Sequence, residues 1–192
     1  MSDSLLQLEG FIELDRVRAV RWARKQLTLD NWAILDTETT GLYNAEIVEI
    51  AIISNTGEPL LNTLVKPTLT IPAKAASIHG ITDDMVATAQ TFPEIYPQIV
   101  EICKINQVLI YNAGFDMSIL DYCCKLHNLP KLKFNLKCLM LIAAEWYGNW
   151  NSYHKSYTYP KLPNGNHRAI GDCLAGLQLI KRMALDSDEI KR

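Results

Sequence analysis

The segment Glu46–Ser54 reads EIVEIAIIS, and its β-branched residues give it the composition of a β-strand. A shorter apolar run, Trp32–Leu35, precedes it, and a third strand is expected over Leu60–Lys66 after the turn residues Asn55–Gly57. Two short links between three strands favour an antiparallel meander. The first part of the chain is therefore expected to begin a sheet.

The rest of the chain alternates between strand and helix patterns, after Pro67 and Pro72 enforce an extended connection. We expect helices over Thr82–Thr88, Pro93–Lys104, Phe115–His127, Leu136–Trp146 and Arg168–Leu185, a strand over Gln107–Tyr111, and a long polar and aromatic loop over 147–166. Early strands followed by strand–helix alternation predict an α/β domain with a mixed sheet.

An amphipathic helix is expected ahead of the sheet, over residues 12–27, with arginines on its polar side. Its end near Thr28–Asn31 marks a joint. We therefore divide the chain into an N-terminal helical extension (1–30), a main domain (31–186) and a polar C-terminal tail (187–192).

Charge and cysteine content limit the classes of function. The chain has 19 Lys and Arg against 21 Asp and Glu, a net charge of −2, which argues against a basic body that binds nucleic acid by bulk charge. Its five cysteines, an odd number without C-x-x-C spacing, indicate free thiols in a reducing compartment. There is no signal-peptide pattern and no apolar run of the ~20 residues that span a bilayer. We expect a cytoplasmic protein that does not enter a membrane.

Acidic residues lie at the ends of predicted strands, where the next element begins. Asp36 and Glu38 follow a buried strand two positions apart, so both carboxylates project from one face. Like charges held this close favour a bridging cation, and hard ions such as Mg²⁺ take oxygen ligands. Asp36-x-Glu38 is also common in solvated loops, so the pattern alone leaves both interpretations open.

Two further pieces are weak when taken singly. Asp116 lies where the Gln107–Tyr111 strand passes into a helix, where a carboxylate can bind a ligand or simply favour the helix dipole. His167 and Asp172 flank the start of the last helix, although a lone loop histidine is usually a surface residue.

In this order, the pieces resemble the DnaQ-like 3′–5′ exonucleases, the DEDDh class, which includes the exonuclease domain of the DNA polymerase III epsilon subunit. The resemblance covers about Trp32 to Ala184. Four segments carry it: Asp36–Gly41 (DTETTG), Ile78–Asp83 (IHGITD), Asn112–Asp116 (NAGFD) and His167–Asp172 (HRAIGD). The resemblance implies an RNase H-like fold, a mixed five-stranded sheet flanked by helices.

The resemblance also implies a two-metal hydrolysis of the phosphodiester at the 3′ end, which releases nucleoside 5′-monophosphates. Asp36, Glu38 and Asp172 would bind the first Mg²⁺ or Mn²⁺, and Asp36 would bridge to a second ion that Asp116 helps to position. His167 would be the general base, because the ordinary pKa of a histidine, ~6.5, suits proton transfer near neutrality.

By the same resemblance, the candidate contacts for the 3′-terminal nucleotide are Thr39, Thr40, Gly41, Leu42 and His79. Packing of a tight turn and a surface imidazole would be the alternative for these residues. The segment 147–166 is short for this family, so we expect a mobile presentation of His167.

Three functions stay open on the sequence. The first is a stand-alone exonuclease acting on single-stranded or 3′-terminal nucleic acid, with DNA favoured over RNA. The second is a polymerase-associated proofreading subunit, although the chain stops 20 residues after Asp172, without a long C-terminal docking extension. The third is a catalytically inactive nucleic-acid-binding module on the same fold.

Overall fold

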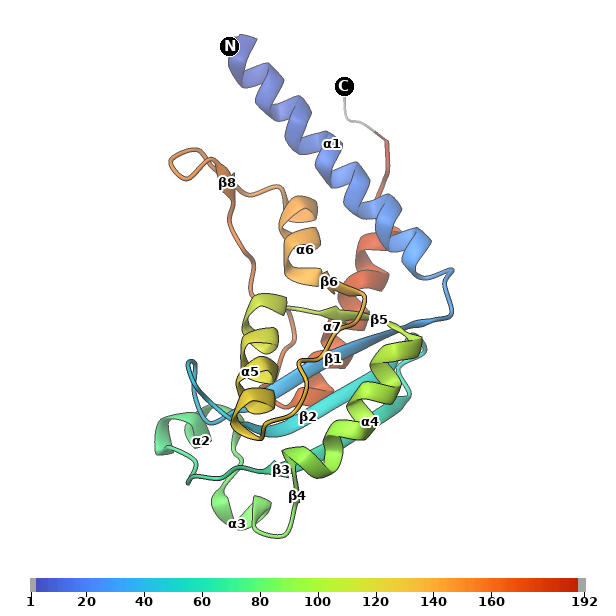
Figure 1. Cartoon of the computed structure of the whole chain (residues 1–192). Coiled ribbons are helices and arrows are strands. Elements are labelled where there is room, and N and C mark those ends of the chain that lie inside the picture. The colour runs from blue at the N-terminus through green and yellow to red at the C-terminus, as the bar shows by residue number, and fades with distance from the viewer. Residues whose placement is uncertain (1–2, 190–192) are drawn as a thin grey trace.

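A six-stranded mixed sheet with the order β4-β3-β2-β1-β5-β6 forms the centre of the computed structural model, which describes residues 3–189 (Figure 1). Its strands are β1 (Trp32–Thr39), β2 (Ile47–Ser54), β3 (Pro59–Lys66), β4 (Gln90–Thr91), β5 (Gln107–Ile110) and β6 (Leu136–Cys138). β1–β2 and β2–β3 pair antiparallel, whereas β1–β5, β5–β6 and β3–β4 pair parallel. The expected meander and the mixed α/β fold are confirmed.

Helices cover both faces of this sheet (Figure 1). They are α1 (Asp3–Gln26), α2 (Ala73–His79), α3 (Asp83–Val86), α4 (Phe92–Ile105), α5 (Ala113–Leu126), α6 (Leu139–Tyr147) and α7 (Ala169–Leu185). In β1, Ala33 and Leu35 pack with residues of α4 and α5, whereas Trp32 and Ile34 pack with residues of α6 and α7. The two faces of β1 thus contact different helices, as the alternation of side chains in a strand requires.

The sheet has six strands where five were expected, because two of its members are only two and three residues long. β6 takes up Leu136–Cys138, which the sequence assigned to a helix; these residues pair with β5, and the helix begins at Leu139. No periodicity can be recognised over three residues, and the open edge of β5 decides their conformation.

Three other boundaries differ from expectation. A helix, α2, follows Pro72 and ends at Gly80, whose φ of 73° is the left-handed conformation that glycine accepts readily. The helix expected over Thr82–Thr88 is reduced to the single turn of α3. The 147–166 loop contains a two-stranded hairpin, β7 (Trp150–Asn151) and β8 (Ser156–Tyr157).

The N-terminal helix packs on the main body. α1 begins at Asp3 rather than near residue 12, and it lies against α6 and α7. Its arginines hold the C-terminal segment: Arg16 Nη1 donates to Ser187 O at 2.7 Å, and Arg24 Nη2 donates to Asp186 O at 2.7 Å. The division at residues 30 and 186 stays a prediction, and residues 190–192 of the expected tail lie outside the described part of the chain. No helix in residues 3–189 is long and apolar enough to cross a membrane.

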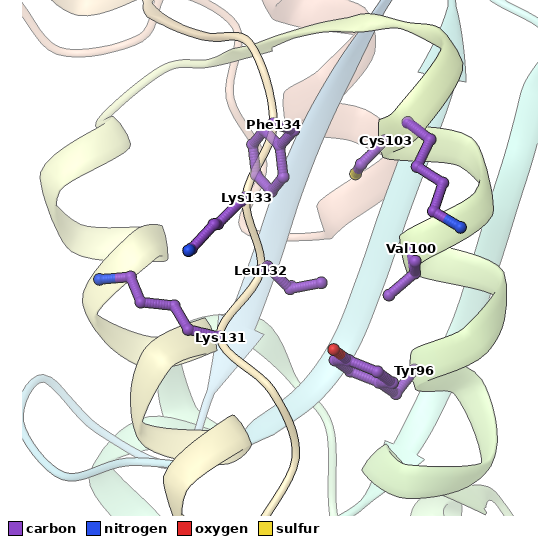
Figure 2. A pocket seen from close by; sticks show the side chains of 8 residues that line it. Tyr96, Val100, Cys103, Lys131, Leu132, Lys133 and Phe134 are labelled. Atoms are coloured by element: carbon purple, nitrogen blue, oxygen red, sulfur yellow. The ribbon is translucent and has the colours of Figure 1, made fainter.

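A pocket of about 190 Å³ lies on the α4 and α5 side of the sheet (Figure 2). Its floor and walls include Cys103 and Leu132, which belong to the hydrophobic cluster on that face. Because the acidic residues singled out above face α7 or the start of α5, this pocket is separate from them.

Candidate active site

Asp36 and Glu38 lie near the carboxyl end of β1 and share the face of Ile34, which packs against α7. Glu38 stands opposite Glu49 of β2 in the antiparallel register. Since side chains two apart in a strand point the same way, the two carboxylates of β1 are directed toward the beginning of α7.

Asp116 reaches the site from the first turn of α5. Because β5 is parallel to β1, the helix that follows β5 begins near the carboxyl end of β1. The side chain of Asp116 is only 3% exposed, and its Oδ1 accepts a hydrogen bond from Thr37 Oγ1 at 2.8 Å. Thr37 lies on the α5 face of β1, so this bond fixes the carboxylate beside the strand that carries the other two acids.

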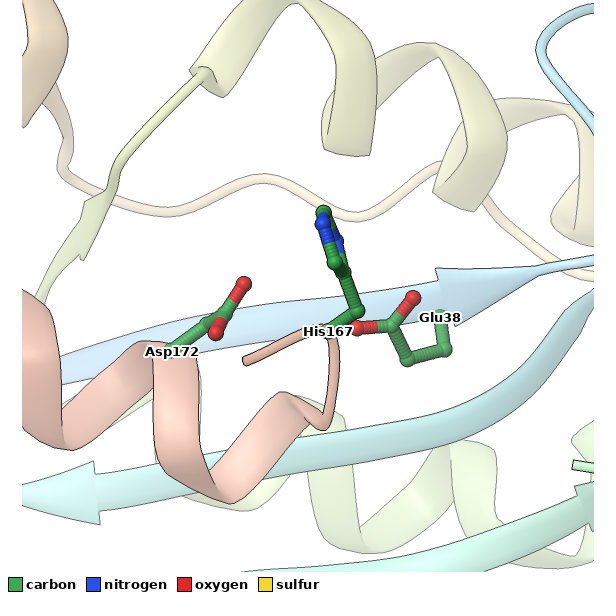
Figure 3. A group of neighbouring side chains, drawn as sticks. All are labelled: Glu38, His167 and Asp172. Carbon is green, nitrogen blue, oxygen red and sulfur yellow. The ribbon is translucent and has the colours of Figure 1, made fainter. Parts of the chain in front are cut away.

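His167 and Asp172 come from the segment that opens α7. One potential ligand atom from each of Glu38, His167 and Asp172 lies within 4.8 Å of the other two (Figure 3). Asp172 Oδ1 also accepts a hydrogen bond from Asn166 N at 2.8 Å. The structure therefore brings together β1 and the start of α7, whose residues are far apart in the sequence.

The four carboxylates influence one another strongly. Burial raises the pKa of Glu38 to about 8, and the charges of Asp172, Glu49 and Asp116 add to this effect. Burial likewise raises the pKa of Asp116 to about 7, against hydrogen bonds that act in the opposite direction. The pKa of Asp36 is raised well above its usual value by burial first and then by the three other acids of the site.

Raised carboxyl pKa values fit a site built for cations. Without a cation, several of these groups retain protons near neutral pH, because their charges would otherwise repel at close range. Carboxylate oxygens are the ligands of Mg²⁺ and Mn²⁺, and a bound ion would replace the protons. The donor set thus suits hard divalent cations, with the imidazole of His167 at its edge.

His167 is exposed to solvent, and its ring lies beside Glu38 and Asp172 rather than turned away (Figure 3). Its backbone φ of 56° is in the left-handed region, where histidine is found more often than most other residues but still infrequently. The next residue, Arg168, binds Glu49 through three close nitrogen–oxygen contacts of 2.6 to 3.1 Å.

Glu49 is a residue of the site that the sequence reasoning missed. It is 3% exposed in the middle of β2, surrounded along the chain by buried apolar residues. A charged residue inside such a run was the available signal, because a buried carboxylate needs a partner. The identity of that partner, Arg168, follows only from the packing of α7 on β2.

The residues proposed to contact the 3′ end lie next to the acids, but they differ in whether their side chains are free to contact a ligand. Thr39 Oγ1 donates to Gly41 O at 2.6 Å, and Thr40 Oγ1 accepts from Glu46 N at 2.9 Å, so both hydroxyls hold the loop after β1. Leu42 is 66% exposed. Their contact with a nucleotide stays a prediction.

His79 is buried rather than a surface imidazole, so that alternative for it is wrong. Its Nδ1 accepts from Ile81 N at 3.0 Å, and its Nε2 lies 3.3 Å from Thr39 O. Burial lowers the pKa of this histidine. The neutral ring therefore supports the loop that carries the other proposed contacts.

Comparisons with known proteins agree with this geometry. The family model RNase_T, described as an exonuclease, matches residues 33–180. The exonuclease CP81 of Escherichia phage 186, whose function is uncharacterized, is 37% identical over 185 residues, which cover 87% of this chain and 92% of that protein.

Two further relatives differ in how much of them is matched. The DNA polymerase III subunit epsilon of Pasteurella multocida is 34% identical over 107 residues, 50% of this chain and 42% of that subunit. The solved structure of exonuclease X in complex with 5′ overhanging duplex DNA has a TM-score of 0.57 and 26% identity, and the match covers 83% of this chain and 96% of that one. The chain thus belongs to the RNase T family of exonucleases.

Proposed function

We propose that the protein is a 3′–5′ exonuclease that removes nucleoside 5′-monophosphates one at a time with the help of two divalent cations. The observation that carries this proposal is the convergence of Glu38, His167 and Asp172 within 4.8 Å, beside the half-buried Asp36 and the buried Asp116. An inactive binding module would have no need of an imidazole in that cluster. Retention of all five residues favours an enzyme.

The proposed roles follow from the donor set. Asp36, Glu38 and Asp172 would hold one Mg²⁺ or Mn²⁺, and Asp36 and Asp116 would hold the other. When bound, such a pair of ions neutralises the phosphate and stabilises the attacking and leaving oxygens. Bound ions would also reverse the sign of the local field, so that the group of acids would attract a phosphate instead of repelling it.

His167 would accept the proton of the attacking water. Its ring is exposed to solvent, and it lies next to the acids without being buried among them. Attack of that water on the phosphorus breaks the bond to the 3′-oxygen of the penultimate nucleotide. The products are a nucleoside 5′-monophosphate and a strand shortened by one residue.

We propose a nucleic-acid 3′ end as the substrate, with DNA favoured over RNA. The net charge of −2 argues against grip along a duplex, so recognition would occur mainly at the terminus. The likeness to exonuclease X, solved with an overhanging DNA duplex, supports DNA. The exposed Leu42, beside Thr39, Thr40 and Gly41, would contact the terminal base.

A polymerase-associated role is the second candidate, because half of this chain matches a DNA polymerase III epsilon subunit. Two arginines of α1, Arg16 and Arg24, already contact the C-terminal segment of this chain and are in part occupied by it. We place the protein in the cytoplasm, since its five cysteines are unpaired and four of them are buried.

The test is a panel of 5′-labelled oligonucleotides of one sequence, as DNA and RNA, single-stranded and with a recessed or protruding 3′ end, each with Mn²⁺ and with EDTA. We expect a ladder that shortens from the 3′ end, fastest on DNA and absent in EDTA. His167→Ala should bind Mn²⁺ but form the ladder at least about 100-fold more slowly. Binding without cleavage would identify the inactive module, and hydrolysis in EDTA would exclude the metal mechanism.

A further inference from the structure

The backbone that follows His167 is anchored to the central sheet through Glu49. Arg168 Nε lies 3.1 and 3.0 Å from the two carboxylate oxygens of Glu49, and Arg168 Nη2 lies 2.6 Å from one of them. Ala169 N donates to Glu49 Oε2 at 2.9 Å. One carboxylate thus holds both residues that come directly after the histidine.

The backbone that precedes His167 is anchored to α7. Asn166 N donates to Asp172 Oδ1 at 2.8 Å, and Asn166 Oδ1 accepts from Arg168 N at 3.2 Å. Gly171 leaves room for this amide, because a Cβ there would lie 2.2 Å from Asn166 Oδ1. His167 therefore lies between two anchored residues, Asn166 before it and Arg168 after it.

His167 needs such anchoring because of its own backbone. A φ of 56° is unfavourable for a residue with a side chain, and it persists only where the surroundings impose it. The side chain is exposed, so burial does not impose it. The hydrogen bonds of Asn166, Arg168 and Ala169 are the contacts that do.

Glu49 is itself rigidly placed. It is 3% exposed in β2, which lies between β1 and β3, and it stands opposite Glu38 in the register of β1 and β2. The strand pair that carries Glu38 therefore also carries the anchor of His167. A functional group held by a packed strand is placed more accurately than one held by a loop alone.

We propose that Glu49 is a positioning residue, which through Arg168 and Ala169 N holds the imidazole of His167 at a fixed place beside the carboxylates of β1. This inference rests on the proposed role of His167 as general base. In this proposal Glu49 and Arg168 do not touch the reacting atoms. They keep the imidazole of His167 aligned with the water that His167 deprotonates.

The chain offers a matched control for Arg168. Arg16 makes the same forked contact, with Nε 3.0 Å from Glu13 Oε2 and Nη2 2.8 Å from Glu13 Oε1, on α1 and away from the acids. Lysine keeps the charge but cannot reproduce a fork, so Arg168→Lys and Arg16→Lys remove the same geometry at two places. Both should fold, and Arg16→Lys should lower the melting temperature at least as much as Arg168→Lys, because Arg16 also contacts Asp186 and Ser187.

Steady-state hydrolysis of a 5′-labelled oligonucleotide in Mn²⁺ distinguishes the two. We expect Arg168→Lys and Glu49→Gln each to lower kcat about 10- to 100-fold, because a misplaced base loses much of its effect. In Arg168→Lys, which keeps the charge, KM and the affinity for Mn²⁺ should stay within about twofold of wild type. Glu49→Gln removes a charge that acts on Glu38, so its kcat is compared at saturating Mn²⁺. Arg16→Lys should keep the wild-type kcat, and the double variant Glu49→Gln/Arg168→Lys should be no worse than the poorer single variant.

A second readout needs no activity. Hydrogen exchange of residues 164–170 in the metal-free protein, followed by mass spectrometry, should quicken in Glu49→Ala and Arg168→Lys but not in Arg16→Lys. Wild-type protein without hydrolysis would refute the proposed function and leave this structural result standing. If wild type is active, three results would overturn the positioning role. The first is a kcat within twofold of wild type in both Glu49→Gln and Arg168→Lys, and the second is a double variant whose loss of kcat is the product of the two single losses. The third is a loss only of affinity for Mn²⁺.

Discussion

The folded protein disfavours the ionised form of Glu38. Removing the charge of Glu38 should therefore stabilise the metal-free protein. Burial and neighbouring acids raise the pKa of Glu38 from the usual 4.5 to about 8. At pH 7 the raised pKa lowers the free energy of unfolding by at most roughly 3 kcal/mol, at about 1.4 kcal/mol per pH unit. Partial solvent screening reduces this to roughly 1–2 kcal/mol.

The sign of the pH dependence follows from proton binding. Between pH 4.5 and about 8 the folded protein holds a proton on Glu38 that the unfolded chain has released, so stability falls as the pH rises through this window. Glu38→Gln removes this effect. Its advantage over wild type should be close to zero at pH 5 and reach about 3–6 °C in melting temperature at pH 7 to 8, in EDTA.

Thermal unfolding of Glu38→Gln beside Glu46→Gln measures this directly. Glu46 is also buried, but it accepts hydrogen bonds from Thr68 N and Thr68 Oγ1 at 2.9 and 2.6 Å, so the same substitution should destabilise there. Mn²⁺ should stabilise wild type more than Glu38→Gln. The reasoning is refuted if Glu38→Gln is no more stable than wild type at pH 7 in EDTA, or if its gain is the same at pH 5 and pH 8.

Three further outcomes are expected. Affinity for Mn²⁺, measured by calorimetry, should rise between pH 6 and pH 8 with release of protons, since the pKa values of Glu38 and Asp116 are about 8 and about 7; a pH-independent affinity would contradict this. Asp36→Asn should lower hydrolysis at least about 1,000-fold while the protein melts no lower than wild type, and retained activity would rule out a bridging ligand. Gly171→Ala should slow turnover about tenfold by displacing Asn166, whereas Gly10→Ala, whose Cβ meets nothing within 4 Å, should not; equal activity of the two would argue against the packing.

The sequence was informative where chemistry and periodicity coincide. Asp36 and Glu38 could be placed on one face because they end a strand, and the structure confirms that this face meets the segment of His167 and Asp172. The meander was equally predictable, since β2 is β-branched over most of its length.

Other features depend on contacts between distant segments. Glu49 could be noticed as a charged residue in an apolar strand, but its role depends on the β1–β2 register and on where α7 packs. Leu136–Cys138 directly precedes helix α6, but it forms a strand because β5 offers an open edge for pairing. Local preference is weak for three residues, so tertiary contacts decide such segments.

The most direct test of the central claim uses an oligonucleotide with a radioactive phosphate on the 5′ side of its last nucleotide. With Mn²⁺, the two-metal account predicts that the first labelled product is a nucleoside 5′-monophosphate, formed by wild type, lost in EDTA, and formed at least about 100-fold more slowly by His167→Ala. A label that leaves on an oligonucleotide, or as free phosphate, would contradict attack at the 3′-terminal phosphodiester. Equal rates for wild type and His167→Ala would contradict the role given to the histidine.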